Sequence, residues 1–463
     1  MRLLTKSNDA STDLGVVERL AYMSGNTGVT FLNVIIGAFL MFYYTDVLFL
    51  NPAVIGTIIL VSRIFDGVTD LAMGLIVDRT HSKYGRCRIW ILRMCVPYAL
   101  SGILMMLVPT GATTTIQYIY VFITYNLCNS ICLTALYVPY NALISNITNN
   151  VVERGYLSIF ATFGSIAATL IIQSTIDSVT KALGGGARAW QIATAGYALL
   201  GLIFCLICFF FTKERCTAVN EKAGEKPKVD FKLEMKSLFG NKYWIMVVAV
   251  VFIGFLNTNL ANGCGMYYAK AILGDTAHYA SFANAMSIAQ MVTICISFIF
   301  VKKLGKRTMM LLSFTVQIIS TVLLGIMPGS VTAAVIFSAL RGFGGGLSGA
   351  IIYAVIADAI DYGEWKYGQK AEGAGMAAMS FAIKVGQGLS TVMLGALMSW
   401  SGYDAAAAVQ SSRATFALNA GFNFIPAAFC LIAFFIMLKY DLDKIYPTIQ
   451  KELAERRQQN AAL

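Results

Sequence analysis

Charged side chains are scarce in this sequence. Asp, Glu, Lys and Arg together make up 13% of its 463 residues, whereas a soluble domain carries roughly 25%. Hydrophobic residues reach 57%, and the mean hydropathy is +0.67. This balance excludes a single soluble globular core and indicates a membrane protein.

The residues and motifs of common active sites are also sparse. The only histidines are His81 and His278, and no cysteine spacing predicts a zinc site. No nucleophile–base pair, metal signature or glycine-rich phosphate loop is visible, so we expect no enzyme activity. Most of the ten cysteines fall inside apolar runs, where they pack as small hydrophobes. Residues 1–20 contain Asp9, Asp13 and Glu18 and lack an apolar core that ends in a cleavage site, which argues against a cleavable export signal.

Long apolar runs fill most of the chain. A helix needs about 20 apolar residues to cross the hydrocarbon layer of a membrane, and twelve runs come near that length. We therefore predict an all-α membrane protein with spans at 25–49, 53–78, 90–109, 116–142, 154–178, 190–211, 243–270, 279–301, 308–327, 331–359, 373–399 and 414–438.

The net charge of +11 is concentrated in alternate loops. Basic residues gather at 79–93, 213–236 and 302–307, whereas the opposite loops hold almost none. By the positive-inside rule, both termini are expected in the cytoplasm of a multi-pass plasma-membrane protein. The alternation of basic and uncharged loops is a topology signal, so we expect no nucleic-acid partner.

A polar stretch at 213–241 divides six spans from six. The expected organisation is a first half at 1–212, a cytoplasmic linker at 213–241, a second half at 242–440 and a cytoplasmic tail at 441–463. Two six-helix halves are typical of the major facilitator fold, whose halves rock around a site near the middle of the membrane. We expect a monomer.

The second span carries three charges. An Asp at the centre of a bilayer costs about 3 kcal/mol on insertion scales, so such a residue usually marks an ion or substrate path. Asp66 and Asp70 are four residues apart and share one helical face, where both could touch one cation. Arg63 lies on the same side. The alternative is that Arg63 and Asp66 only neutralise each other as a buried pair.

Several ordered motifs point to a family. They are FYYTDV at 42–47, RIFD at 63–66, KYGRCRIW at 83–90, ADAIDYGEWKYGQKAEG at 357–373 and FAIKVG at 381–386. Together with Val138-Pro139-Tyr140, they make the chain resemble the glycoside-pentoside-hexuronide:cation symporters, the melibiose permease group. The resemblance implies symport with H⁺ or Na⁺ and no other cofactor.

The resemblance implies a cation site at Asp66, Asp70 and Thr134. Two carboxylates one helical turn apart repel each other unless a proton or a cation lies between them. Thr69 departs from the Asn of melibiose carriers, which leaves the identity of the ion open. The alternative for Thr134 is a hydrogen bond within its own helix.

The sugar-binding acids of melibiose permease are absent. Thr30 and Tyr137 occupy their places, and the Arg of span five has no match. The candidate substrate residues are Asn26, Thr30, Asn33, Tyr137, Asn141, Tyr353 and Lys384. For each, interhelical hydrogen bonding is the alternative. Lys384 could pair with an acid of the cation site or receive an anionic group of the substrate. The loss of two acids favours an acidic glycoside first and a neutral glycoside second.

Charges of opposite sign are expected to form a cytoplasmic gate. The predicted gating residues are Arg63, Arg79, Arg86, Arg88, Asp358, Asp361, Glu364 and Glu372. The alternative is ordinary solvated loop charge. The glycine run at 342–346 would let helices approach closely or bend.

The leading function is therefore cation-coupled symport of a glycoside, uronide or related small polar solute by alternating access. The second hypothesis is a proton-coupled exporter of amphipathic compounds. A receptor or scaffold without transport is disfavoured, because the charges inside the second span would then lack a reason.

Overall fold

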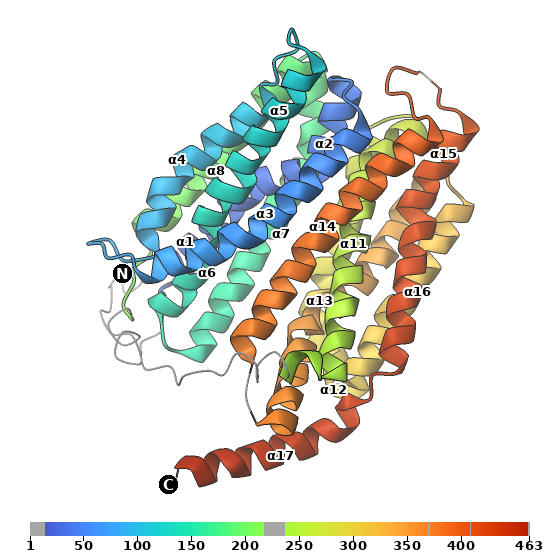
Figure 1. Cartoon of the computed structure of the whole chain (residues 1–463). Coiled ribbons are helices and arrows are strands. Elements are labelled where there is room, and N and C mark those ends of the chain that lie inside the picture. The colour runs from blue at the N-terminus through green and yellow to red at the C-terminus, as the bar shows by residue number, and fades with distance from the viewer. Residues whose placement is uncertain (1–13, 217–236, 369–370, 408, 462–463) are drawn as a thin grey trace. The chain divides into compact units, whose positions relative to one another are not determined.

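The computed structural model describes residues 14–216, 237–368, 371–407 and 409–461. These residues form helices joined by loops, with no strand among them (Figure 1). The chain divides into two compact units. Unit 1 comprises Met1–Lys226 with Asp404–Ala408, and unit 2 comprises Pro227–Tyr403 with Val409–Leu463. Most of the expected linker, 217–236, lies outside the described residues.

Unit 1 is built from long helices joined by short loops. Wider π-helical turns interrupt the first and fourth spans. The elements are α1 (Val16–Val34), a π turn (Ile35–Phe39), α2 (Leu40–Phe42), a π turn (Tyr43–Val47), α3 (Pro52–Asp78), α4 (Arg88–Met106), α5 (Thr114–Tyr125), a π turn (Asn126–Leu133), α6 (Thr134–Ile147), α7 (Val151–Ala182) and α8 (Ala187–Phe211).

Unit 2 is also built mostly from long helices joined by short loops. Its elements are α11 (Lys242–Ala271), α12 (His278–Ile326), α13 (Val331–Tyr367), α14 (Glu372–Ser401), α15 (Ser412–Asn419), a π turn (Ala420–Phe424), α16 (Ile425–Leu438) and α17 (Leu442–Ala461). Gly305 divides α12 into two membrane spans, because its φ of 74° lies in the left-handed region that favours glycine.

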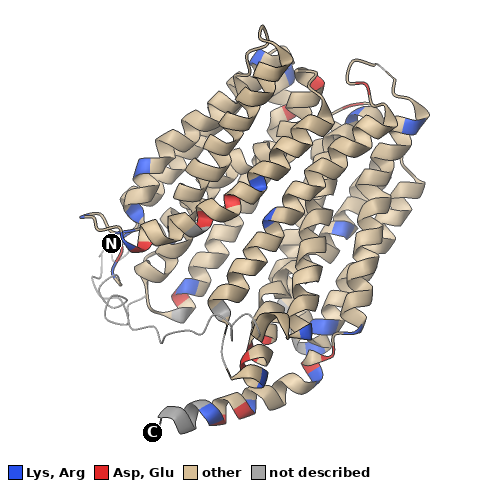
Figure 2. Cartoon of the chain, in the orientation of Figure 1, with Lys and Arg blue, Asp and Glu red and all other residues tan. Residues whose placement is uncertain are grey.

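Within the described residues, eleven helices are long and apolar enough to cross a membrane. The remaining expected span, at 53–78, is present as α3, whose 27 residues form one continuous helix. It falls outside the apolar set because Arg63, Asp66 and Asp70 lie within it. Figure 2 shows that few charged residues interrupt the other helices and that many lie near helix ends.

The first helix begins earlier than predicted, at Val16 rather than near residue 25. Its early charges are paired with other parts of unit 1. The Arg19 guanidinium donates to the Glu153 carboxylate at 2.7 Å, and Arg215 donates to Glu18 at 2.8 Å. These long-range ion pairs let a polar stretch remain helical.

Close helix contacts hold unit 1 together. Helix α1 packs against α7 and α8. A Cβ atom at Gly28 would come within 2.6 Å of the Gly201 carbonyl oxygen, and the reverse contact is equally short. Small residues are therefore required where α1 and α8 cross, as is common between membrane helices.

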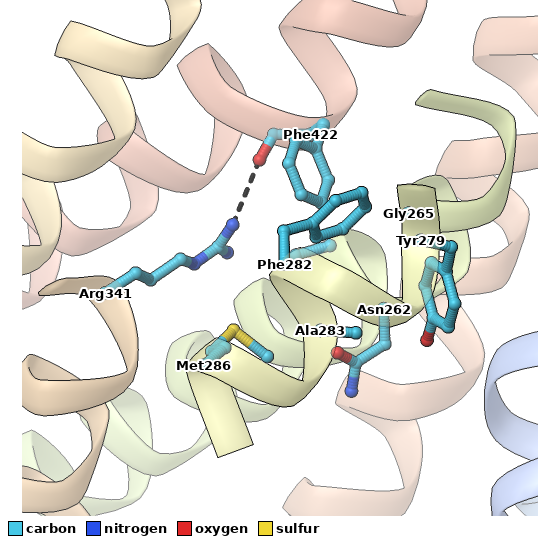
Figure 3. A pocket seen from close by; sticks show the side chains of 9 residues that line it. Asn262, Gly265, Tyr279, Phe282, Ala283, Met286, Arg341 and Phe422 are labelled. Atoms are coloured by element: carbon cyan, nitrogen blue, oxygen red, sulfur yellow. Dashed lines mark hydrogen bonds between the residues drawn. The ribbon is translucent and has the colours of Figure 1, made fainter. Parts of the chain in front are cut away.

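The core of unit 2 contains a buried guanidinium. Arg341 on α13 is 8% exposed. It donates to the Phe422 carbonyl at 3.1 Å (Figure 3) and to the Asn257 amide oxygen at 3.0 Å. Helix α13 continues to Tyr367, beyond the predicted end at residue 359. Asp361, which lies beyond the predicted span, is therefore on the same helix as Asp358.

Candidate functional site

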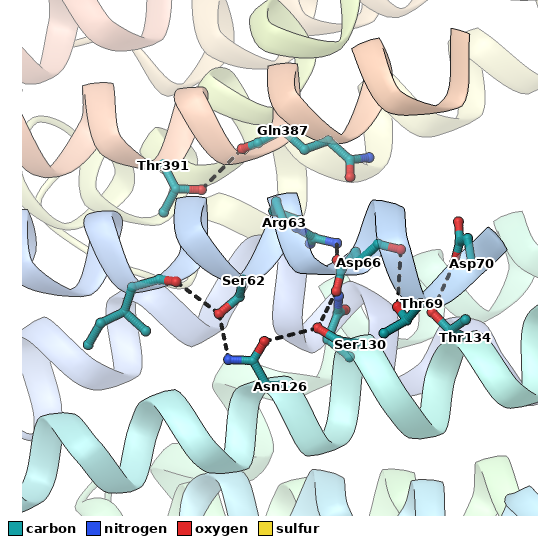
Figure 4. Close-up of polar contacts among 12 residues, drawn as sticks. Ser62, Arg63, Asp66, Thr69, Asp70, Asn126, Ser130, Thr134, Gln387 and Thr391 are labelled. Carbon is teal, nitrogen blue, oxygen red and sulfur yellow. Dashed lines mark hydrogen bonds and ion pairs between the residues drawn. The ribbon is translucent and has the colours of Figure 1, made fainter. Parts of the chain in front are cut away.

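The Asp66 carboxylate lies at the centre of a polar cluster in unit 1 (Figure 4). Its side chain is 2% exposed and pairs with Arg63 at 3.3 Å. Asn129 donates to one carboxylate oxygen at 2.7 Å, and the Ser130 hydroxyl donates to the other. The buried ion pair proposed from the sequence is present, and two neutral donors from another helix support it.

The π turn at Asn126–Leu133 places these donors. A π turn holds more residues than an α-helical turn, and such turns are frequent at functional sites. The wider turn lets the adjacent residues Asn129 and Ser130 both reach Asp66 on α3. Asn126, at the start of the turn, donates to the Ser62 hydroxyl at 2.8 Å, so α3 and this turn are joined along one face.

Asp70 lies one turn further along α3. The Thr134 hydroxyl donates to its carboxylate at 3.0 Å. The side chain of Thr134 thus bonds across helices rather than within its own helix, and its part in a cation site stays a prediction. The structure brings Asp66, Asp70 and Thr134 into one polar cluster, and Thr69 donates to the Asp66 backbone carbonyl at 3.1 Å.

Three buried polar atoms around Asp66 have no hydrogen-bond partner among the described residues: the Asn129 amide oxygen, the Arg63 Nε and the Tyr125 hydroxyl. The Arg63 guanidinium carbon lies 6.0 Å from the centre of the Tyr125 ring. Buried polar groups are rarely left unsatisfied without a reason. The unpaired Asn129 oxygen and the nearby carboxylates are hard oxygen ligands of the kind that small cations prefer.

The substrate candidates of unit 1 divide into two groups. Asn26 donates to the Ala161 carbonyl, and Thr30 contacts the Ser165 hydroxyl at 3.0 Å. Both side chains therefore make the interhelical bonds of the alternative interpretation. Tyr137 is 39% exposed and stacks on Tyr140 with ring centres 6.1 Å apart.

Asn33 and Asn141, also in unit 1, have exposed side chains. The remaining two substrate candidates lie in unit 2. Tyr353 on α13 is 65% exposed and lines a cavity. Lys384 on α14 is half-buried and is not among the residues that line this cavity.

The predicted gating acids have partners inside unit 2. Lys306 forms an ion pair with Asp358, and the Tyr446 hydroxyl donates to Asp361 at 2.9 Å. Glu364 is half-buried on α13. The side chain of Glu372 lies outside the described residues.

The predicted gating bases belong to unit 1. The backbone N–H groups of Arg86 and Arg88 donate to Glu214 at 3.1 and 2.8 Å. Arg79 caps the end of α3 and is exposed, and Arg63 belongs to the Asp66 cluster. The clasp between these bases and the acids of unit 2 stays a prediction.

The sequence interpretation missed Asn126, Asn129 and Ser130. A signal was available, because Asn126, Ser130 and Thr134 recur every four residues and therefore share one helical face. It also missed a set of carboxamides that line the cavity of unit 2. Amides scattered over several apolar spans gave no local pattern that would bring them together.

Comparisons with known proteins show what the chain is similar to. The sequence model of the family described as MFS/sugar transport protein matches residues 21–444. The chain is 28% identical to the isoprimeverose transporter of Lactiplantibacillus pentosus, over 96% of this chain and 93% of that protein. It is 24% identical to the glucuronide carrier protein homolog of Escherichia coli (strain K12), over 95% of each. The crystal structure of D-xylose-proton symporter shares the fold, with a TM-score of 0.65 and 14% identity over 92% of this chain and 97% of that chain.

Proposed function

Because this chain belongs to the MFS/sugar transport protein family, and is thus a membrane transporter rather than an enzyme, we propose that it is a cation-coupled symporter. It imports a glycoside, uronide or related small polar solute together with H⁺ or Na⁺. It acts as a monomer in the plasma membrane, with both termini in the cytoplasm. The similarity to an isoprimeverose transporter and to a glucuronide carrier homolog supports the solute class.

The observation that carries the proposal is the environment of the two carboxylates on α3. Arg63 compensates the charge of Asp66, and Asn129 and Ser130 fix the orientation of its carboxylate. One turn away, Thr134 orients Asp70. A cluster with fixed carboxylates and an unpaired amide oxygen is organised to take up a proton or a small cation.

Coupling requires that the cation and the solute each favour the same conformational states. An occupied cation site removes the repulsion between Asp66 and Asp70, and so changes the relative free energies of the states of the carrier. A cation gradient then drives the solute inward, because only the doubly loaded and the empty carrier interconvert readily.

The test uses purified protein in liposomes with an imposed Na⁺ or pH gradient and labelled glycosides and uronides. Asp66→Asn and Asp70→Asn should abolish accumulation against a gradient and leave solute exchange measurable. Asp177→Asn is the matched control, because Asp177 pairs on α7 with Lys181, which is 48% exposed. Concentrative uptake that survives both changes on α3 would refute the proposal.

The same preparation tests the direction of transport. Right-side-out vesicles should accumulate the solute when the cation gradient points inward. Accumulation only in inverted vesicles would identify the alternative, a proton-coupled exporter.

A further inference from the structure

Unit 2 contains a cavity of about 460 Å³ between α11, α12, α13 and α14. This volume lies within the range of small-molecule sites. Five side-chain carboxamides line it: Asn257, Asn259, Asn262, Gln290 and Gln317. Among the described residues, no Asp, Glu, Lys, Arg or His side chain lines the cavity.

Glycines keep the cavity open. A Cβ atom built on Gly254, Gly345 or Gly349 would meet nothing within 4 Å, and all three line the cavity. By contrast, a Cβ atom on Gly346 would come within 2.7 Å of the Gln290 carbonyl oxygen. The glycine run on α13 thus serves two purposes: Gly346 permits close packing, and Gly345 leaves space for a molecule.

The buried Arg341 fixes the orientation of one carboxamide. A guanidinium has only donors, so the Asn257 oxygen must face it, as the 3.0 Å contact records. The Asn257 nitrogen is then directed to Cys430, whose sulfur is a weak acceptor at 3.2 Å. In Figure 3 the Arg341 side chain points toward Phe422, and Asn262 lies in the same region of unit 2.

Three of the other amides retain hydrogen-bonding capacity. The side-chain amides of Asn262 and Gln290 make no hydrogen bond with any other described residue. Asn259 donates to the Phe255 carbonyl at 2.8 Å, which leaves its amide oxygen available. A carboxamide offers both donors and acceptors, as a sugar hydroxyl does. The aromatic rings of Phe255 and Tyr353, which also line the cavity, can cover the apolar face of a ring.

We propose that this cavity binds the neutral, hydroxyl-bearing ring of the transported glycoside. The assignment rests on the proposed transport function and deepens it, because it names the chemistry of the solute and the residues that select it. Carboxamides recognise hydroxyls without requiring a counter-charge. The absence of charged lining residues among those described disfavours a carboxylate at this position, because a buried charge must be paired.

The test measures binding to the purified full-length chain without any gradient, by ligand-induced thermal stabilisation. The probes are isoprimeverose, methyl xyloside, methyl glucoside and methyl glucuronide. A neutral probe should bind more tightly than the glucuronide. Gln290→Leu and Asn262→Leu should each weaken its binding about tenfold or more, because each removes hydrogen bonds to hydroxyls.

Gly349→Leu should abolish binding by filling the cavity. Gly196→Leu is the matched control, because Gly196 is exposed on α8 of unit 1 and a Cβ atom there also meets nothing within 4 Å. Each variant must retain the melting temperature of the unliganded protein within a few degrees. A variant whose melting temperature differs by more than this is replaced by the Ala substitution at the same position.

Unchanged affinity in the three cavity variants overturns the assignment, as does stronger binding of the glucuronide or no binding of any probe. The proposed symport is judged separately by gradient-driven uptake and its loss in Asp70→Asn. Uptake that depends on Asp70 but not on Gln290 or Asn262 would refute the subsite and leave the symporter intact.

Discussion

Removal of the neutral donors that hold Asp66 should weaken binding of the coupling cation. Asn129→Leu and Ser130→Ala each delete one hydrogen bond to a buried carboxylate. A hydrogen bond to a charged group contributes about 1.5–3 kcal/mol. Loss of a partner that orients a cation ligand typically lowers affinity about 10–100-fold. We therefore expect each variant to raise the cation concentration needed for half-maximal uptake by about that factor.

The assay is uptake of a neutral glycoside at a series of Na⁺ concentrations and pH values, with the solute held at saturation. Ser145→Ala is the control for Ser130→Ala, because the Ser145 hydroxyl donates only to the Ala142 carbonyl in its own helix. The maximal rate of uptake should change little. If both variants keep the cation dependence of the unmodified protein, Asn129 and Ser130 serve only to pack the helices, and the reasoning about Asp66 is wrong.

Replacing Lys384 by Met should leave the affinity for a neutral glycoside nearly unchanged, as measured by thermal stabilisation, because Lys384 does not line the cavity of unit 2; a loss of about tenfold would place Lys384 at the solute. A maleimide label should reach a new Cys near Lys226 only from the cytoplasm and one near Gly111 only from outside, in a cysteine-free background; the reverse pattern would overturn the orientation. Glu153→Ala should lower stability by about 2 kcal/mol, because it leaves Arg19 without its carboxylate; an unchanged melting temperature would contradict this.

Much of the fold was predictable because its signals are local in the sequence. The apolar runs predict the spans, and the ordered motifs predict the family, which the match over residues 21–444 confirms. The charges on α3 were also visible. Their spacing indicated a polar face, and the ion pair of Arg63 with Asp66 follows from three-residue spacing on a helix.

The parts that the sequence interpretation missed depend on contacts between distant segments. Asn129 and Ser130 reach Asp66 across more than 60 residues of sequence, and only because a π turn shifts the helical register. An interpretation based on α-helical spacing cannot predict that shift. The early start of α1 depends likewise on the pairing of Arg19 with Glu153 on α7.

The cavity of unit 2 could not be predicted from the sequence for a related reason. Each of its carboxamides lies alone in an apolar span, where an interhelical hydrogen bond is the usual explanation. Only the packing of α11, α12 and α13 shows that the side-chain amides of Asn262 and Gln290 face the same space and make no hydrogen bond with a described residue. The preference for an acidic solute came from Lys384 and from the missing acids, and the neutral lining favours the second choice instead.

The charge of the transported solute decides whether the membrane potential helps to drive its uptake. The two acids of the proposed cation site, Asp66 and Asp70, lie in unit 1, and the cavity of unit 2 has no charged lining among the described residues. With one cation per solute, a neutral glycoside would carry one net positive charge inward in each cycle. A membrane potential of 100 mV contributes about 2.3 kcal/mol per charge, which corresponds to about 50-fold accumulation. A uronide would cancel the charge of the cation and gain nothing from the potential. Uptake of a neutral glycoside should therefore respond to an imposed potential and uptake of the matching uronide should not, so the voltage dependence reports the charge of the natural solute.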